Sequence, residues 1–103
     1  MDKSSQLLTL FIDKEMEADV VDCLIQLDGV NGFTVSKSFG FSSESAHLNK
    51  AEQVAGGRNM LKVEIIHNSN CAHVALESLA GLNSRNPLRY IITPIIESGH
   101  LIS

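Results

Sequence analysis

The strongest constraint on the fold is a short apolar run near the start of the chain, residues 7–12. Its length suits a β-strand, in which successive side chains point to opposite faces. Both sets of side chains are apolar: one holds Leu8, Leu10 and Ile12, and the other holds Leu7 and Phe11. A strand with one face in water would alternate with polar residues, so this strand must be covered on both faces.

The periodicity of the rest of the chain predicts a β-α-β-β-α-β order. The expected elements are a strand (7–12), a helix (15–28), two strands (32–41 and 60–67), a helix (from 69 or 70 to 82) and a strand (88–96). This order predicts an α+β, ferredoxin-like sandwich over residues 1–103, with a four-stranded antiparallel sheet and two helices on one face. Pro94 cannot donate to a strand ladder, so the last strand should lie at an edge or be bulged there.

Two helices cover only one face of such a sheet, so the other face needs another partner. A second copy of the chain is the simplest one. The net charge is −4 and no basic stripe is present, which argues against binding to nucleic acid. No apolar run is long enough for a signal peptide or a membrane span, so we expect a cytoplasmic protein without a transmembrane segment.

The segment 42–59 is long for a connection between two strands and has no clear periodicity. It is rich in Ser, Asn and Gly, which bury little surface, so we expect it to be mobile in the free protein. Loops carry much of the function of small domains. We therefore expect this segment to bind a partner or ligand.

The stretch GVNGFTVSKSFGF, from Gly29 to Phe41, resembles the PII family of signalling proteins. The strand MLKVEII, from Met60 to Ile66, is similar to the strand that follows in that family. Gly40 and Phe41 match the start of the long PII T-loop. The resemblance implies a homotrimer of ferredoxin-like subunits that regulates a transporter or an enzyme through this loop.

The resemblance also implies nucleotide binding between subunits, but the basic residues for it are largely missing. Met60 stands in place of the lysine before the third strand, with Arg58 the nearest candidate. Ile95 and Glu97 stand in place of two late arginines. Because phosphate binding needs positive charge or clustered N–H donors, we expect ATP to bind weakly or not at all.

The stretch EQVAGGR, residues 52–58, resembles the Glu-x-Val-x-Gly-Arg-like loop of a small PII-like family of unknown function in proteobacteria, to which this chain is more similar. Here that stretch places Glu52, Val54, Gly56 and Arg58 as candidate ligand or partner residues. Glu52 and Arg58 form an ion pair or an anion-binding element in this interpretation, and the alternative is a solvated loop without a role. Some members lie beside heavy-metal efflux genes, and the CutA divalent-cation-tolerance family shares the trimeric architecture. Both resemblances imply a link to metal response.

Three metal-ligating residue types follow one another at the end of the third strand: His67, Cys71 and His73. Thiolate and imidazole groups bind soft or borderline metals. The alternative is that Cys71 packs in the core as a reduced thiol and His73 faces water, since residues two apart on a helix do not share a face. No certain cofactor follows from either interpretation.

Motifs that would indicate catalysis are absent from the sequence, including a Gly-x-Ser-x-Gly elbow and a His-Glu-x-x-His helix. We therefore expect no enzymatic activity. Three hypotheses remain: a trimeric PII-like regulatory or interaction module, a CutA-like metal-binding or metal-tolerance protein, and an assembly domain without a ligand.

Overall fold

The computed structural model describes residues 5–41, 57–68, 71–82 and 88–102, the side chain of Asn31 excepted. The elements are β1 (Ser5–Ile12), η1 (Lys14–Met16), α1 (Glu17–Ile25), β2 (Val30–Gly40), β3 (Arg58–Asn68), α3 (Ala72–Ala80) and β4 (Arg89–Pro94). The predicted β-α-β-β-α-β order and α+β class are confirmed. Among the described residues, no helix is both long enough and apolar enough to cross a lipid bilayer.

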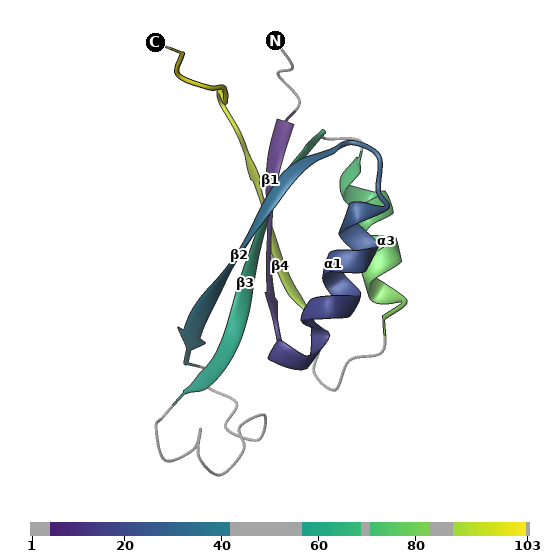
Figure 1. Cartoon of the computed structure of the whole chain (residues 1–103), viewed down its shortest axis with the longest axis vertical. Helices are drawn as coiled ribbons and strands as arrows, with labels where there is room; N and C mark the ends of the chain where they lie inside the picture. Colours follow the sequence, from purple (N-terminus) through teal and green to yellow (C-terminus); the bar gives the residue numbers. More distant parts are fainter. Residues whose placement is uncertain (1–4, 42–56, 69–70, 83–87, 103) are drawn as a thin grey trace.

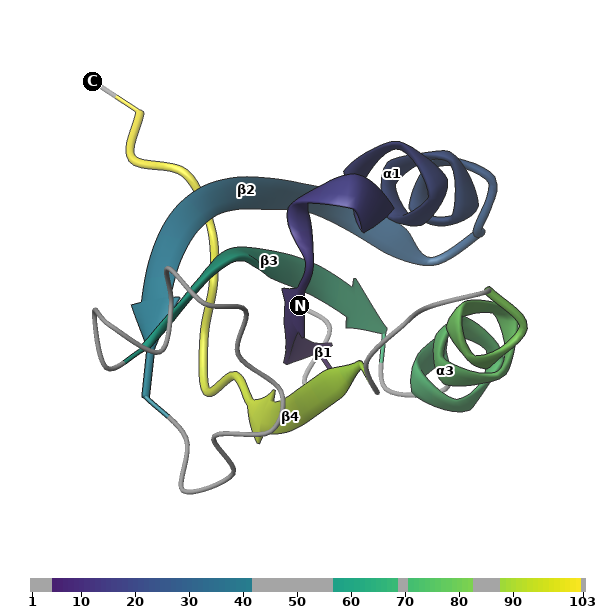
Figure 2. The same ribbon diagram turned by 90° about the horizontal axis from the view of Figure 1, so that it is seen from below.

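The four strands form one antiparallel sheet in the order β2-β3-β1-β4. Figures 1 and 2 show α1 and α3 side by side on one face of this sheet, and no helix of the described residues lies on the other face. Strand β1 lies in the interior, where Leu8 pairs with Ile65 of β3 and with Ile92 of β4. Strand β4 is at an edge and ends at Pro94, as predicted.

The first helix is shorter than its apolar periodicity predicted. A 3-10 turn precedes α1, and after α1 the N–H of Leu27 donates to the carbonyl of Leu24 at 3.2 Å, which tightens the chain. Gly29 then takes a φ of +87°, a left-handed conformation that suits glycine, and its carbonyl accepts from Asn68 N–H at 3.1 Å. This turn sends the chain into β2, so the helix stops short of the predicted end.

The core lies between the sheet and the two helices. Alternate residues of β1 and β3 point into it, together with apolar residues of the helices. Its buried members include Leu8, Leu10, Ile12, Val20, Leu24, Leu61, Val63, Ile65, Ala75 and Leu79. The opposite, helix-free face of the sheet also carries apolar residues: Leu7 and Phe11 are half-buried, and Ile66 and Ile91 are exposed. We call this second set, Leu7, Phe11, Ile66 and Ile91, the open-face patch.

Candidate functional site

The candidate site is the end of the β2–β3 ribbon, where both strands run past the helices (Figure 1). Pairing continues along the two strands from Val30 and His67 to Gly40 and Arg58. Gly40 and Arg58, predicted as loop residues, are therefore the last pair of the ladder. Phe41 follows directly and is 74% exposed. The predicted loop thus begins and ends on a regular, hydrogen-bonded base.

An aromatic cluster closes one side of this base. The rings of Phe39 and Phe41 meet edge to face, with centroids 5.2 Å apart. The Phe39 ring lies directly over Gly57: a Cβ placed on Gly57 would be 2.5 Å from Phe39 Cε2 and 2.7 Å from the carbonyl oxygen of Gly40. Glycine is therefore required at position 57 by close approach of both ring and backbone.

An ion pair ties the same base to the body of the sheet. Arg58 Nη1 lies 3.5 Å from Asp13 Oδ1, and the two side chains are only 16% and 8% exposed. Asp13 directly follows β1, so the contact joins the start of β3 to the loop after the central strand. Removing one partner of such a shielded pair costs more folding stability than removing one partner of a surface pair, because the remaining charge stays buried without compensation.

The ion pair bears on the predicted role of Arg58. The sequence left Arg58 with three interpretations: an ion pair with Glu52, an anion-binding element, or no role. Glu52, Val54 and Gly56 lie outside the described residues, as do residues 42–56 of the segment expected to be mobile, so these interpretations stay predictions. The structure places Arg58 against Asp13. Its guanidinium is therefore engaged within the fold, which supports a structural role at the loop base.

The predicted metal ligand His67 is buried, with a relative exposure of 1%. Its Nδ1 lies 2.7 Å from the carbonyl oxygen of Asn68, and a carbonyl only accepts, so Nδ1 carries the proton. In the neutral ring Nε2 is then a bare acceptor, and it has no hydrogen-bond partner among the described residues. Gln6 pairs with His67 across the strands, and its Oε1 is also buried without a hydrogen-bond partner among the described residues.

The other two predicted metal ligands have different surroundings. Cys71 is buried at the start of α3 and its thiol donates to the carbonyl of Asp28 at 3.3 Å, while His73 is exposed. Within the described part of the chain, no three His, Cys, Asp or Glu residues gather closely enough to hold a metal ion. The structure therefore brings two of the three candidates into the interior and leaves the third on the surface.

Both cysteines are reduced, and burial raises the pKa of each thiol; the Asp28 carboxylate raises the pKa of Cys71 further. Well below about pH 8.5 the thiols are protonated in the folded and unfolded chains alike, so their ionisation does not affect stability. As pH rises toward the raised pKa values, the unfolded chain loses these protons more readily. We expect stability to fall in that range.

Urea unfolding at about pH 7 and about pH 9.5 tests this prediction. The matched control is the double variant Cys23→Ser, Cys71→Ser, which retains all other titrating groups. We expect its midpoint to fall less than that of the natural chain. An equal fall in both chains would show that the thiols contribute nothing.

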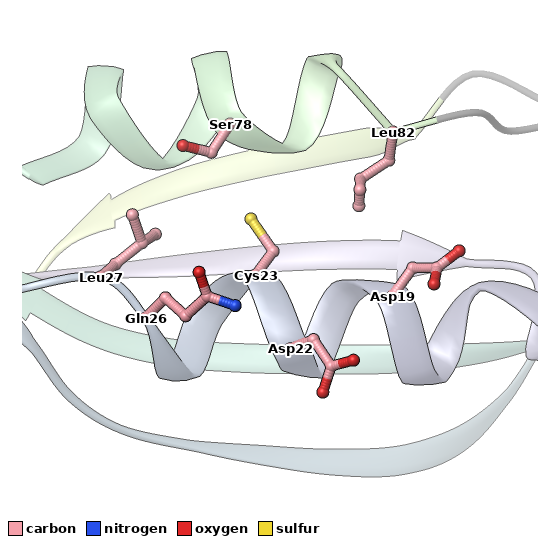
Figure 3. A pocket seen from close by; sticks show the side chains of 7 residues that line it. All are labelled: Asp19, Asp22, Cys23, Gln26, Leu27, Ser78 and Leu82. Atoms are coloured by element: carbon pink, nitrogen blue, oxygen red, sulfur yellow. The ribbon is translucent and has the colours of Figure 1, made fainter.

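A pocket of about 490 Å³ opens between α1 and α3. Figure 3 shows the Cys23 thiol pointing into the space between the helices, with Ser78 and Leu82 on the opposite side. Asp19 and Asp22 also line it, and both are exposed to solvent. Because these carboxylates are in contact with solvent, the pocket does not enclose a ligand. The ribbon end therefore remains the candidate site.

Three residues at the ribbon end were missed by sequence reasoning: Asp13, Phe39 and Gly57. Asp13 directly follows the predicted strand 7–12, and nothing local links it to position 58. The Gly56-Gly57 pair was a usable signal, because a glycine next to a strand often marks close backbone approach. The contact that requires it, however, comes from Phe39, which is remote in sequence.

Similar structures share this architecture. A PII-like signalling protein from Thermus thermophilus superposes with a TM-score of 0.63 at 21% identity, over 92% of this chain and 90% of that one. A Bacillus cereus protein related to NIF3 superposes with a TM-score of 0.72 at 11% identity, over 95% of this chain and 27% of that one. At these identities the likeness establishes the fold alone.

A crystal structure of a DUF3240 protein from Shewanella baltica is 34% identical, with a TM-score of 0.79 over 96% of this chain and 98% of that one. A search of curated proteins found no significant match. Residues 3–102 match the family described as "Protein of unknown function (DUF3240)". The chain therefore belongs to the DUF3240 family, whose fold is PII-like.

Proposed function

We propose that this protein is a cytoplasmic, trimeric, PII-like regulatory module without catalytic activity. It acts on a protein partner, a transporter or an enzyme, through the segment between β2 and β3. The observation that supports this proposal is the anchored base of that segment. The aromatic contact to Gly57 and the Arg58–Asp13 ion pair both lie where the segment joins the sheet.

The anchoring is more extensive than a simple turn between two strands needs. A hairpin turn usually takes about 2–5 residues, whereas the connection from β2 to β3 spans residues 41–57. A fixed base reduces the freedom that a long segment loses on binding, because its two ends are already held. Gly40, Phe41 and Arg58 act in this proposal as the base, and Glu52, Val54 and Gly56 as contact residues.

The trimer is supported by the open-face patch. Ile91 is 43% exposed and Ile66 36% exposed on the face that no helix covers. Burial of apolar surface yields about 25 cal/mol per Å², so three such faces packed together would stabilise an assembly substantially. In a trimer, three copies of the β2–β3 segment face the partner together. Several linked contacts bind more tightly than a single one, so the assembly increases avidity.

Site-specific photocrosslinking in cells tests the loop. We expect a photoreactive amino acid at position 48 to link the protein to a larger partner on ultraviolet illumination. The control places the same group at exposed position 80 on α3. A second control exchanges residues 43–55 for a short turn, and we expect it to bind no partner while its unfolding midpoint stays within the natural range.

The proposal fails if position 48 yields the same products as position 80. It also fails if illumination gives only links between copies of this chain. Light scattering of the natural chain provides the assembly test, and a monomer mass at micromolar concentration would contradict the trimer.

A metal-linked function is the second candidate, favoured by the Nε2 of buried His67, which has no hydrogen-bond partner in the described part of the chain. Neutral imidazole nitrogen is a common metal ligand, and Cys71, also buried, supplies a thiol. Exposed His73 would have to complete the set by a local rearrangement. Binding would stabilise the folded chain by mass action.

Thermal unfolding with Zn²⁺ or Cu⁺ tests this candidate. Metal binding by these residues predicts a rise in Tm that His67→Asn and Cys71→Ser remove and His47→Asn leaves in place. If neither ion raises Tm, or if the rise survives loss of both His67 and Cys71, these residues are not the site. ATP and bicarbonate belong in the same screen, and we expect little or no shift from ATP.

A further inference from the structure

The C-terminal segment that follows β4 carries apolar side chains that nothing in the described chain covers. The N–H of Ile95 donates to the carbonyl of Ser5 at 3.2 Å, and within the described residues no later backbone hydrogen bond ties this segment to the sheet. Beyond it Ile96 is 95% exposed, Ile102 is 91% exposed and Leu101 is fully exposed. We call residues 96–102 the tail. Three large aliphatic side chains exposed within seven residues mark an interaction segment.

A second unpaired apolar feature lies at the other end of the molecule. Phe41 is 74% exposed and Phe39 44% exposed, and their rings contact each other. Figure 1 shows the tail leaving the sheet at the end near the N-terminus, whereas β2 ends at the opposite end. Figure 2 shows that the tail departs on the side away from the helices.

The tail is too short to reach this aromatic pair within one chain. Phe39 pairs with Asn59, and Ser5, beside the start of the tail, pairs with Asn68. The nine residue steps along β3 between those pairs span about 30 Å. A fully extended tail of seven residues reaches at most about 25 Å. Its partner must therefore be another molecule.

The charges near the two features are complementary. Glu97 is exposed beside Ile96 in the tail. Lys37 is exposed on β2 and lies two residues before Phe39, hence on the same face of the strand. The tail therefore presents an aliphatic side chain beside a carboxylate, and β2 presents an aromatic ring close to a lysine. The two surfaces match in both apolar character and charge. Such complementarity orients docking and favours this partner over others.

We propose that the tail of one copy docks on the Phe39–Phe41 pair of the next copy, with Glu97 facing Lys37. This inference rests on the self-association proposed above, and it adds to the open-face patch a second pair of surfaces that join neighbouring copies. The contact joins two different patches, so it is heterologous, and repeated around an axis it closes a ring. An odd-numbered ring such as a trimer requires a contact of this kind.

Light scattering of tail and aromatic variants tests the proposal. The variants are a chain ending at Ile95, Leu101→Asp and Phe41→Ser, with exposed Val74→Ser on α3 as the matched control. We expect each of the first three to weaken association by more than about tenfold, as loss of a central contact does. We expect Val74→Ser to leave association unchanged. Because these side chains are largely exposed in the single chain, the fold is preserved, which circular dichroism checks.

Disulfide trapping establishes which surfaces meet. Phe41→Cys and Leu101→Cys, carried on separate chains in a Cys23→Ser, Cys71→Ser background and mixed, should form a mixed disulfide on oxidation. Either variant alone should not cross-link efficiently. Glu97→Lys should weaken association, and Lys37→Glu in the same chain should restore it.

The outcomes separate the two proposals. A monomeric natural chain would overturn the trimer and the docking together. A natural chain that associates, with a shortened chain that associates equally well and no mixed disulfide, would overturn the docking and leave the trimer standing.

Discussion

Replacing Leu8 by alanine should lower the free energy of unfolding by about 2–5 kcal/mol, the range for a large-to-small change in a packed core. Leu8 lies on the interior strand β1, is fully buried, and pairs with Ile65 and Ile92. Removing its side chain creates a cavity that the surrounding strands cannot fill, because both neighbours are held by the ladder. Urea unfolding measures the loss.

The adjacent residue supplies the matched control. Leu7→Ala removes the same atoms from the open-face patch, where the side chain is half-buried. In the single chain we expect its cost to be at most about half that of Leu8→Ala, since less apolar surface is lost. Equal costs in a monomeric chain would contradict the one-sided core.

The same two variants, Leu8→Ala and Leu7→Ala, can also be compared by measuring how the unfolding midpoint depends on protein concentration. If the chain assembles through the open-face patch, the unfolding midpoint of the natural protein rises with concentration. Leu8→Ala should keep this dependence at a lower midpoint, and Leu7→Ala should lose it. A concentration dependence that survives Leu7→Ala would place the assembly contact elsewhere.

Replacing Gly57 by alanine should cost about 1–3 kcal/mol, as overpacking of a closely packed site does. The new Cβ would meet Phe39 Cε2 at 2.5 Å and the Gly40 carbonyl oxygen at 2.7 Å. The ring can turn, but the carbonyl belongs to a paired strand, so relief requires the ribbon end to open. Thermal or urea unfolding detects the loss.

Gly81→Ala is the control for this prediction. Gly81 follows α3 with a φ of −75°, and its added Cβ would lie 3.5 Å from the Ser78 carbonyl oxygen, an ordinary contact. We expect a change within about 0.5 kcal/mol or a small gain. A Phe39→Ala change in the Gly57→Ala chain should recover only part of the loss, because the backbone contact remains. If Gly57→Ala is as mild as Gly81→Ala, the base of the loop is not tightly closed.

The resemblance to PII proteins extends to the fold and not to the basic residues expected to bind phosphate. The chain shares its fold with PII-like proteins, while the basic residues associated with phosphate binding are replaced by Met60, Ile95 and Glu97. Arg58, the candidate nearest to the expected site, contacts Asp13. Within the described residues the fold therefore retains the ribbon that presents a loop and directs its nearby arginine to structural support.

The order of elements, the fold class and the edge position of β4 were predictable from the sequence alone. Each depends on local chemistry: apolar periodicity selects strand or helix, and proline at position 94 restricts the last strand to an edge. The helix ends were less predictable, because the turn at Gly29 is completed by Asn68, a residue from another strand.

Only the tertiary structure decided how the candidate site is held. Arg58 lies far from Asp13 along the chain, and Gly57 lies far from Phe39, so no local pattern relates either pair. Likewise, His67 is buried with its Nδ1 hydrogen-bonded and its Nε2 without a partner among the described residues, which a Cys-His spacing does not reveal. Sequence periodicity reports which face of an element is apolar, but the partner of a given side chain depends on strand register and on the path of the turns.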